Sequence, residues 1–140
     1  MATHCAPPVS EKKPIRSFRD LKVWEKAFTL AIDIHRMTRT LSEDTPSALP
    51  IGMRESAVAM TTQIAQGHTH SYVRDFLRCL DHSLVALSDL ETRILLAGAL
   101  RYMSSDTCRV LEDRLAEVRR MEWGLVNRLR ARDAGNVSPA

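Results

Sequence analysis

The residues best suited to hold a metal ion lie around one predicted helix turn. Cys79 and His82 stand three positions apart, and His68 and His70 precede them. Thiolate and imidazole are ligands that tetrahedral zinc accepts. A di-metal bundle would instead need Glu-x-x-His pairs on facing helices, and no glutamate in the chain has a histidine three residues on. We therefore interpret these histidines as surface residues, and expect neither a metal site nor a bound cofactor.

Nucleophilic catalysis has no better support in the sequence. Cys79 and Cys108 fall on apolar helical stripes, where a thiol is usually an inert core residue. No glycine-rich phosphate-binding motif is present. Acid–base pairs such as Asp89 and Arg93 have the spacing of local helical ion pairs. We predict no catalytic residue and no enzyme activity.

The composition is typical of one helical domain. The chain has 140 residues, of which 44% are hydrophobic and only 5% aromatic, with a formal charge of +3. These values exclude a collagen, a disulfide scaffold and a disordered chain. Three unpatterned cysteines favour a reducing compartment. The longest apolar run, Ile94 to Leu100, is too short to span a bilayer, and no signal peptide is evident. We expect a cytoplasmic protein.

Apolar periodicity predicts an all-α, antiparallel up-down-up-down four-helix bundle over residues 17–133. Ser17 and Asp20 have capping-box spacing, Gly67 is a natural stop for the second helix, and Ser71 can cap the third. A disordered arm (1–16) and a disordered tail (134–140) flank the bundle. The predicted helices cover residues 18–41, 49–67, 71–100 and 105–132.

The first predicted helix carries two apolar stripes, which is more than one bundle core needs. One stripe contains Trp24 and Phe28. Either this helix is central and well covered, or one stripe contacts another subunit. We assign the second stripe to an oligomer interface, and it contains Val23, Ala27, Leu30, Ile34 and Met37.

Positive charge is concentrated in two segments, one at each end of the chain. In an up-down-up-down bundle the first helix begins where the fourth helix ends, so the two segments converge and strengthen the local field. We expect a nucleic-acid-binding surface there, although the same residues could simply solubilise the bundle. Its predicted members are Arg16, Arg19, Lys22, Lys26, Arg119, Arg120, Arg128, Arg130 and Arg132.

Two blocks of the sequence resemble a known family. Residues 18–27, FRDLKVWEKA, are similar to the opening FrdLkVWqkA of the bacterial four-helix-bundle family named for 23S rRNA intervening-sequence proteins. Residues 54–67 resemble that family's RRAAVSIPANIAEG block, and residues 76–92 follow its third-helix pattern. The family-motif residues that match are Trp24, Arg54, Ile64, Ala65 and Gly67.

The resemblance implies a non-enzymatic bundle that assembles into a homopentameric ring. A related branch, the accessory variability proteins of diversity-generating retroelements, works with a reverse transcriptase and RNA, so a reverse transcriptase is a further expected partner. The chain departs from the family pattern where Glu55 replaces an arginine and Thr61 replaces a proline. We expect an oligomeric scaffold that binds RNA or an RNA–protein complex. The alternative is a protein-interaction adaptor without a nucleic-acid role.

Overall fold

The computed structural model describes residues 14–135, which form four long helices and two short 3-10 segments. The predicted arm and tail therefore lie outside the described residues, except for 14–16 and 134–135. No strand occurs within this described range, and the all-α, four-helix class is confirmed. The elements in chain order are η1 (Phe18–Asp20), α1 (Lys22–Met37), η2 (Thr38–Thr40), α2 (Ala48–Thr69), α3 (Val73–Ala99) and α4 (Ser105–Gly135).

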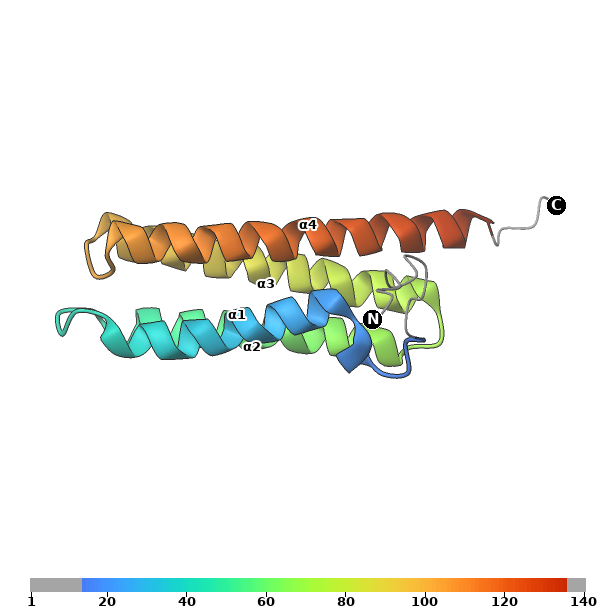
Figure 1. The fold of residues 1–140 in the computed structure, drawn as a ribbon, viewed down its shortest axis with the longest axis horizontal. Coiled ribbons are helices and arrows are strands. Elements are labelled where there is room, and N and C mark those ends of the chain that lie inside the picture. The colour runs from blue at the N-terminus through green and yellow to red at the C-terminus, as the bar shows by residue number, and fades with distance from the viewer. Residues whose placement is uncertain (1–13, 136–140) are drawn as a thin grey trace, which may run out of the picture.

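The four long helices lie side by side along one axis (Figure 1). Their connections alternate between the two ends of the molecule, so the start of α1 and the end of α4 lie at the same end. α2 and α3 share the most extensive contact, whereas α1 and α4 meet over a smaller surface. We call the end that holds the start of α1 and the end of α4 the basic end.

The core is built from the apolar stripes that the sequence predicts. On α3 the buried set includes Leu80, Leu87 and Ile94, and on α4 it includes Leu111 and Leu115. These residues recur at intervals of three or four, which places them on one helical face. Each helix therefore contributes one continuous stripe to a shared interior.

The predicted capping box is present, but it serves a short 3-10 turn. The Ser17 hydroxyl accepts a hydrogen bond from the backbone N–H of Arg19, and the Asp20 carboxylate accepts from that of Ser17. The chain is then extended at Leu21 before α1 begins. The first predicted helix is thus divided into η1, α1 and η2.

Most of the predicted helix boundaries differ from those in the structure. Gly67 does not end α2, which continues to Thr69, and α4 runs to Gly135 rather than 132. A β-carbon at Gly67 would lie 2.7 Å from a ring carbon of Phe76 and 3.0 Å from the Cys79 β-carbon. The glycine therefore permits close packing of α2 on α3. Ser71 does not cap α3, whose N-cap is Tyr72 without a side-chain cap bond.

The predicted oligomer interface on the first helix is also wrong, because its residues form the core of the single chain. Val23, Ala27, Leu30 and Ile34 are all buried in the bundle, and Met37 packs against the same core. A second copy cannot contact side chains that are already enclosed. The other stripe of α1 is the one that faces outward, since Phe28 is exposed and Trp24 is half-buried.

Candidate functional site

The structure places the start of α1 and the end of α4 at the same end, so the two basic segments lie in the same half of the bundle, with Arg119 and Arg120 midway along α4 (Figure 1). Some of these cations are already neutralised by ion pairs. Lys26 lies 3.2 Å from Glu117 of α4. Arg119 binds Glu91 of α3 through two hydrogen bonds of 3.1 and 3.2 Å. These two cations therefore hold helices together, which reduces their availability to a ligand.

The other predicted cations of this group have no ion pair with any residue that the structure describes. Arg130 places its guanidinium carbon 5.9 Å from the centre of the Trp123 ring, in cation–π geometry. The remaining side chains make no hydrogen bond or ion pair with any residue between 14 and 135, and all are exposed. They are Arg16, Arg19, Lys22, Arg120, Arg128 and Arg132. We call these six residues the free cations.

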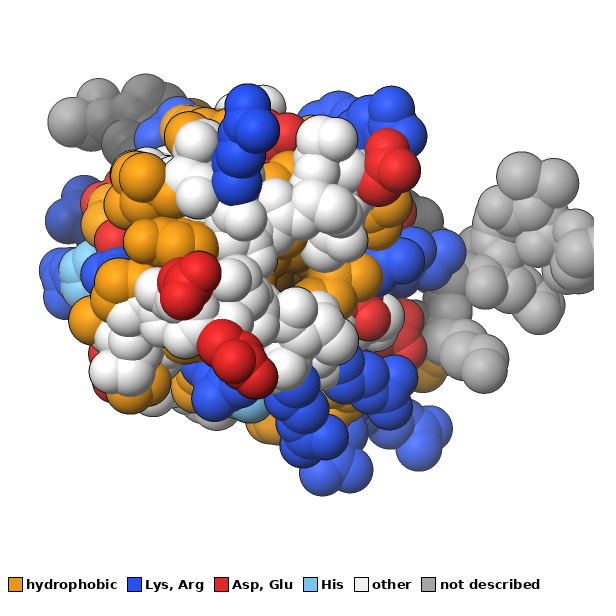
Figure 2. Space-filling model, turned by 90° about the vertical axis from the view of Figure 1, so that its left-hand side faces the viewer, with side chains coloured by type: hydrophobic (Ala, Val, Ile, Leu, Met, Phe, Trp, Pro, Cys, Tyr) orange, Lys and Arg blue, Asp and Glu red, His pale blue; other side chains and the backbone are white. Residues whose placement is uncertain are grey.

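The opposite end of the bundle has a different surface. Figure 2 shows that the centre of this end is occupied mainly by uncharged and hydrophobic side chains, with a few acidic groups. Lys and Arg side chains lie towards the edge of the view.

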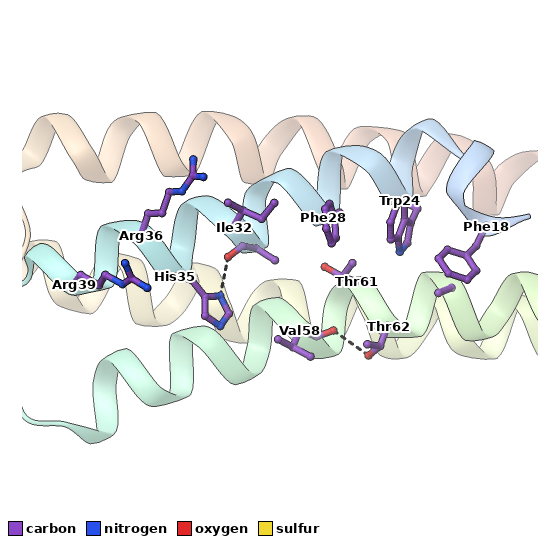
Figure 3. Close-up of a pocket in the computed structure, with 12 residues that line it drawn as sticks. Phe18, Trp24, Phe28, Ile32, His35, Arg36, Arg39, Val58, Thr61 and Thr62 are labelled. Atoms are coloured by element: carbon purple, nitrogen blue, oxygen red, sulfur yellow. Dashed lines mark hydrogen bonds between the residues drawn. The ribbon is translucent and has the colours of Figure 1, made fainter.

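A groove between α1 and α2 was not predicted from the sequence. It has a volume of about 690 Å³ and is lined mainly by apolar side chains of both helices. Figure 3 shows Phe18, Trp24, Phe28 and Ile32 along one side and Val58, Thr61 and Thr62 along the other. Trp24 stacks on Phe28 with ring centres 4.9 Å apart, and Phe18 meets Trp24 edge-on at 5.0 Å. We call this feature the aromatic groove.

Basic side chains line one end of the aromatic groove. His35, Arg36 and Arg39 are exposed there, and none of the lining residues is acidic. The His35 ring shares a hydrogen bond of 2.9 Å with the Ala31 carbonyl oxygen. The side chains of Arg36 and Arg39 make no hydrogen bond or ion pair within the described part of the chain. The groove is thus apolar along its length and positively charged at one end.

Glu122 is a buried acid in the middle of the bundle, and it was not predicted to be one. Its side chain is 0% exposed, and burial raises its pKa to about 7. One carboxyl oxygen contacts the hydroxyl of Ser83, which in turn lies 2.9 Å from the carbonyl oxygen of Met60. The heptad positions of Leu115, Val118 and Leu125 around it could have revealed its burial from the sequence.

A second polar cluster joins α2 to α3 near the surface. Asp89 accepts hydrogen bonds from Ser56 and from Arg93, the latter at 3.1 Å. The hydrogen bond from Ser56 is the main reason that the pKa of Asp89 is lowered. A β-carbon at Gly52 would lie 2.1 Å from the Arg93 guanidinium, so glycine makes room for this side chain. The cluster is a structural contact between helices.

The family-motif residues of α2 have structural roles. Ile64 and Gly67 are buried, and Ala65 lines the aromatic groove. Arg54 donates from Nε to the Thr38 hydroxyl at 2.8 Å, and thereby fastens α2 to the end of α1. None of these residues forms a reactive constellation with another.

The histidines and cysteines around the α2–α3 turn do not converge. Among the residues that the structure describes, no three His, Cys, Asp or Glu side chains are placed to hold a metal ion. His68 instead meets Phe76 edge-on at 6.2 Å. No helix in the described segment is long and apolar enough to span a membrane.

Comparisons with known proteins agree with this fold. The model of the family described as 23S rRNA-intervening sequence protein matches residues 19–124. A solved structure of a protein of unknown function from the S23 ribosomal protein family of Bacteroides thetaiotaomicron has a TM-score of 0.70. The two chains are 15% identical, and the likeness covers 74% of this chain and 97% of that one. The curated proteins contain no match.

Proposed function

The chain belongs to the family of 23S rRNA-intervening sequence proteins, and from that premise we propose that it is a non-enzymatic scaffold that binds RNA. The ligand would contact the free cations at the basic end. Phosphate groups are the natural partners of arginine, because its planar guanidinium matches their geometry. In this proposal the cations of the basic end bind phosphate groups and do not only keep the bundle soluble.

The observation that supports this proposal is that the six free cations come from the start of α1 and from the second half of α4, which lie in the same half of the bundle (Figure 1). Neutralised pairs such as Lys26 with Glu117 contribute less to the field. Arg16, Arg19 and Lys22 lie just before η1, in η1 and at the start of α1, and the other three free cations lie on α4. Several phosphates of one backbone could therefore be bound at once.

Assembly is a second part of the proposal. We propose that copies of the chain form a ring, with five as the number expected from the family resemblance. A ring would multiply the basic ends and so strengthen attraction to a polyanion. A reverse transcriptase is the proposed protein partner, and its retention by the purified chain would be the corresponding test.

The experiment that tests RNA binding measures affinity for single-stranded and duplex RNA as salt is raised. Binding through about six phosphates should weaken by roughly 10³-fold between about 50 and 200 mM salt. A triple variant, Arg120→Glu, Arg128→Glu and Arg132→Glu, should lose binding while remaining helical. Salt-insensitive binding, or no binding, would contradict the proposal.

A matched control places the same charge change at the other end of the molecule. The variant Arg36→Glu, Arg39→Glu and Arg101→Glu alters the net charge equally but leaves the free cations intact. It should retain most of the RNA affinity. Equal loss in both triple variants would show that net charge, and not the basic end, governs binding. The assembly proposal is tested separately by sedimentation, where a monomer at micromolar concentration would contradict it.

A further inference from the structure

The aromatic groove has no part in the proposed RNA binding, and its chemistry differs from that of the basic end. Phe28 and Val58 are 45% and 46% exposed, although both are large apolar side chains beside the half-buried Trp24. An apolar groove of this kind is the surface on which amphipathic helices dock. We propose that the aromatic groove binds an acidic, amphipathic α-helix of a partner protein.

The lining favours aliphatic side chains over nucleic-acid bases. Trp24 and Phe28 stack on one another at an interplanar angle of 20°, and Phe18 lies against Trp24. These contacts occupy ring faces on which a base would otherwise stack. The opposite wall is formed by Val58 and by the methyl-bearing side chains of α2. Leucine or methionine side chains fit such a surface.

The dimensions favour a helix. From Trp24 to Arg39 the groove follows about 15 residues of the chain, or roughly 20 Å at the helical rise. A partner helix of about four turns has this length and presents apolar anchors at i, i+3 or i+4, and i+7. Phe28 and Val58 in the lining are exposed to solvent, which leaves room for the polar face of that helix on the outer side.

Charge defines the rest of the partner. The basic end of the groove contains His35, Arg36 and Arg39, and the groove lining contains no acid. In Figure 3 the Arg39 side chain extends towards His35 beside the groove. Glutamate or aspartate beside the apolar anchors would pair with these cations, whereas lysine would be repelled. Electrostatic complementarity of this kind selects partners and sets their orientation.

The experiment uses a synthetic helix as the probe. The peptide has about 15 residues, leucines at the anchor spacing, glutamates on its flanks and blocked ends. The protein carries Trp123→Phe, so that Trp24 is its only tryptophan. Binding should shift the Trp24 emission to the blue and saturate at a 1:1 ratio. A peptide with lysine in place of glutamate should bind at least tenfold more weakly.

Variants separate the groove from general hydrophobic attraction. Val58→Asp should weaken peptide binding at least tenfold and leave RNA affinity unchanged. Val85→Asp is the matched control, since Val85 is 65% exposed on α3 and does not line the groove. It should leave peptide binding intact. Equal weakening in the two variants, or absence of acidic-peptide binding, would overturn the proposal.

Two further outcomes would assign the groove to a different occupant. If Val58→Asp converts an oligomer to a monomer in sedimentation, a second copy of the chain fills the groove. If single-stranded RNA displaces the peptide from the protein, nucleic acid does. Either result would overturn the partner-helix proposal. Failure of RNA binding alone would contradict only the function proposed for the basic end.

Discussion

The carboxyl group of Glu122 and the hydroxyl of Ser83 are in hydrogen-bond contact at the centre of the bundle. Ser83 has one hydroxyl proton, and its oxygen lies within hydrogen-bond distance of two acceptors, the Met60 carbonyl and Glu122. Both contacts are satisfied when Glu122 is protonated, because Glu122 then donates to Ser83 and Ser83 donates to Met60. Burial is the main cause of the raised pKa of Glu122, and it outweighs the opposing effects of the Ser83 hydrogen bond and of Arg119.

Stability should therefore decrease as the pH rises through the range in which Glu122 ionises. The unfolded chain loses this proton near pH 4.5, whereas the folded chain keeps it to about pH 7. The folded state binds more protons between these values, so the free energy of unfolding falls by about 3 kcal/mol across them. Chemical denaturation at pH 4 and pH 8 measures this change.

Glu122→Gln should remove most of that pH dependence. The glutamine amide can donate to Ser83 as the protonated acid does, and it does not ionise. We compare the free energy of unfolding of the variant with that of the wild type at each pH. This difference should be about 3 kcal/mol more favourable to the variant at pH 8 than at pH 4. Glu117→Gln is the control, because Glu117 pairs with Lys26 at the surface, where such pairs contribute little. An unchanged pH profile in the Glu122 variant would contradict the assignment.

The pKa of Asp89 should depend on Ser56. The hydrogen bond from Ser56 is the largest cause of the lowered pKa, and Arg93 adds to it. Ser56→Ala should therefore raise the pKa of Asp89 towards its ordinary value of 3.8, as measured by carboxyl NMR titration. Ser88→Ala leaves the cluster intact and should not move it. Because the pKa is lowered in the folded state, the stabilisation is present at neutral pH and is lost in acid.

Substitution of Gly67 should destabilise the contact between α2 and α3. Gly67→Ala places a methyl group where Phe76 and Cys79 already lie, and overpacking of this kind typically costs about 1–3 kcal/mol. Gly124→Ala is a matched helical control, because its β-carbon would approach only the flexible end of Arg128, at 3.4 Å. That variant should be neutral or up to about 1 kcal/mol more stable. Equal stability of the two variants would contradict the packing role of Gly67.

Arg54 should stabilise the end of α1 through Thr38. The Thr38 hydroxyl accepts from Arg54 and lies 2.7 Å from the Ile34 carbonyl oxygen, to which it donates. Arg54→Lys loses the fixed planar donor and should cost about 1 kcal/mol. Arg54→Lys and Thr38→Val should be non-additive in a double-mutant cycle. Strict additivity would show that the two side chains act independently.

Helix positions could be predicted because each apolar stripe repeats at the helical period. Gly67 was misassigned because a glycine that ends a helix and one that admits a neighbouring helix look alike in sequence. The position of Phe76 on α3 distinguishes the two roles, and that position depends on tertiary packing. Boundaries were therefore less predictable than the existence of the helices.

The choice between the two stripes of α1 could not be made from hydrophobicity. Leu30 and Ile34 face the core, while Trp24 and Phe28 face outward, yet both stripes are apolar. The aromatic groove was not foreseen because it requires the relative placement of α1 and α2. Glu122 was not predicted to be buried because acids are almost never fully buried, although its position follows the buried heptad of α4.

The unequal contacts among the helices have a consequence for native-state fluctuations. α2 and α3 are joined extensively, whereas α1 has less contact with α4. Partial opening should therefore begin where α1 meets α4, and the amide hydrogens of these two helices should exchange before those of the α2–α3 pair. Because α1 forms one wall of the aromatic groove, an occupant that bridges α1 and α2 would slow that exchange. Hydrogen exchange would therefore detect such an occupant as slower exchange of the α1 amides than in the free protein.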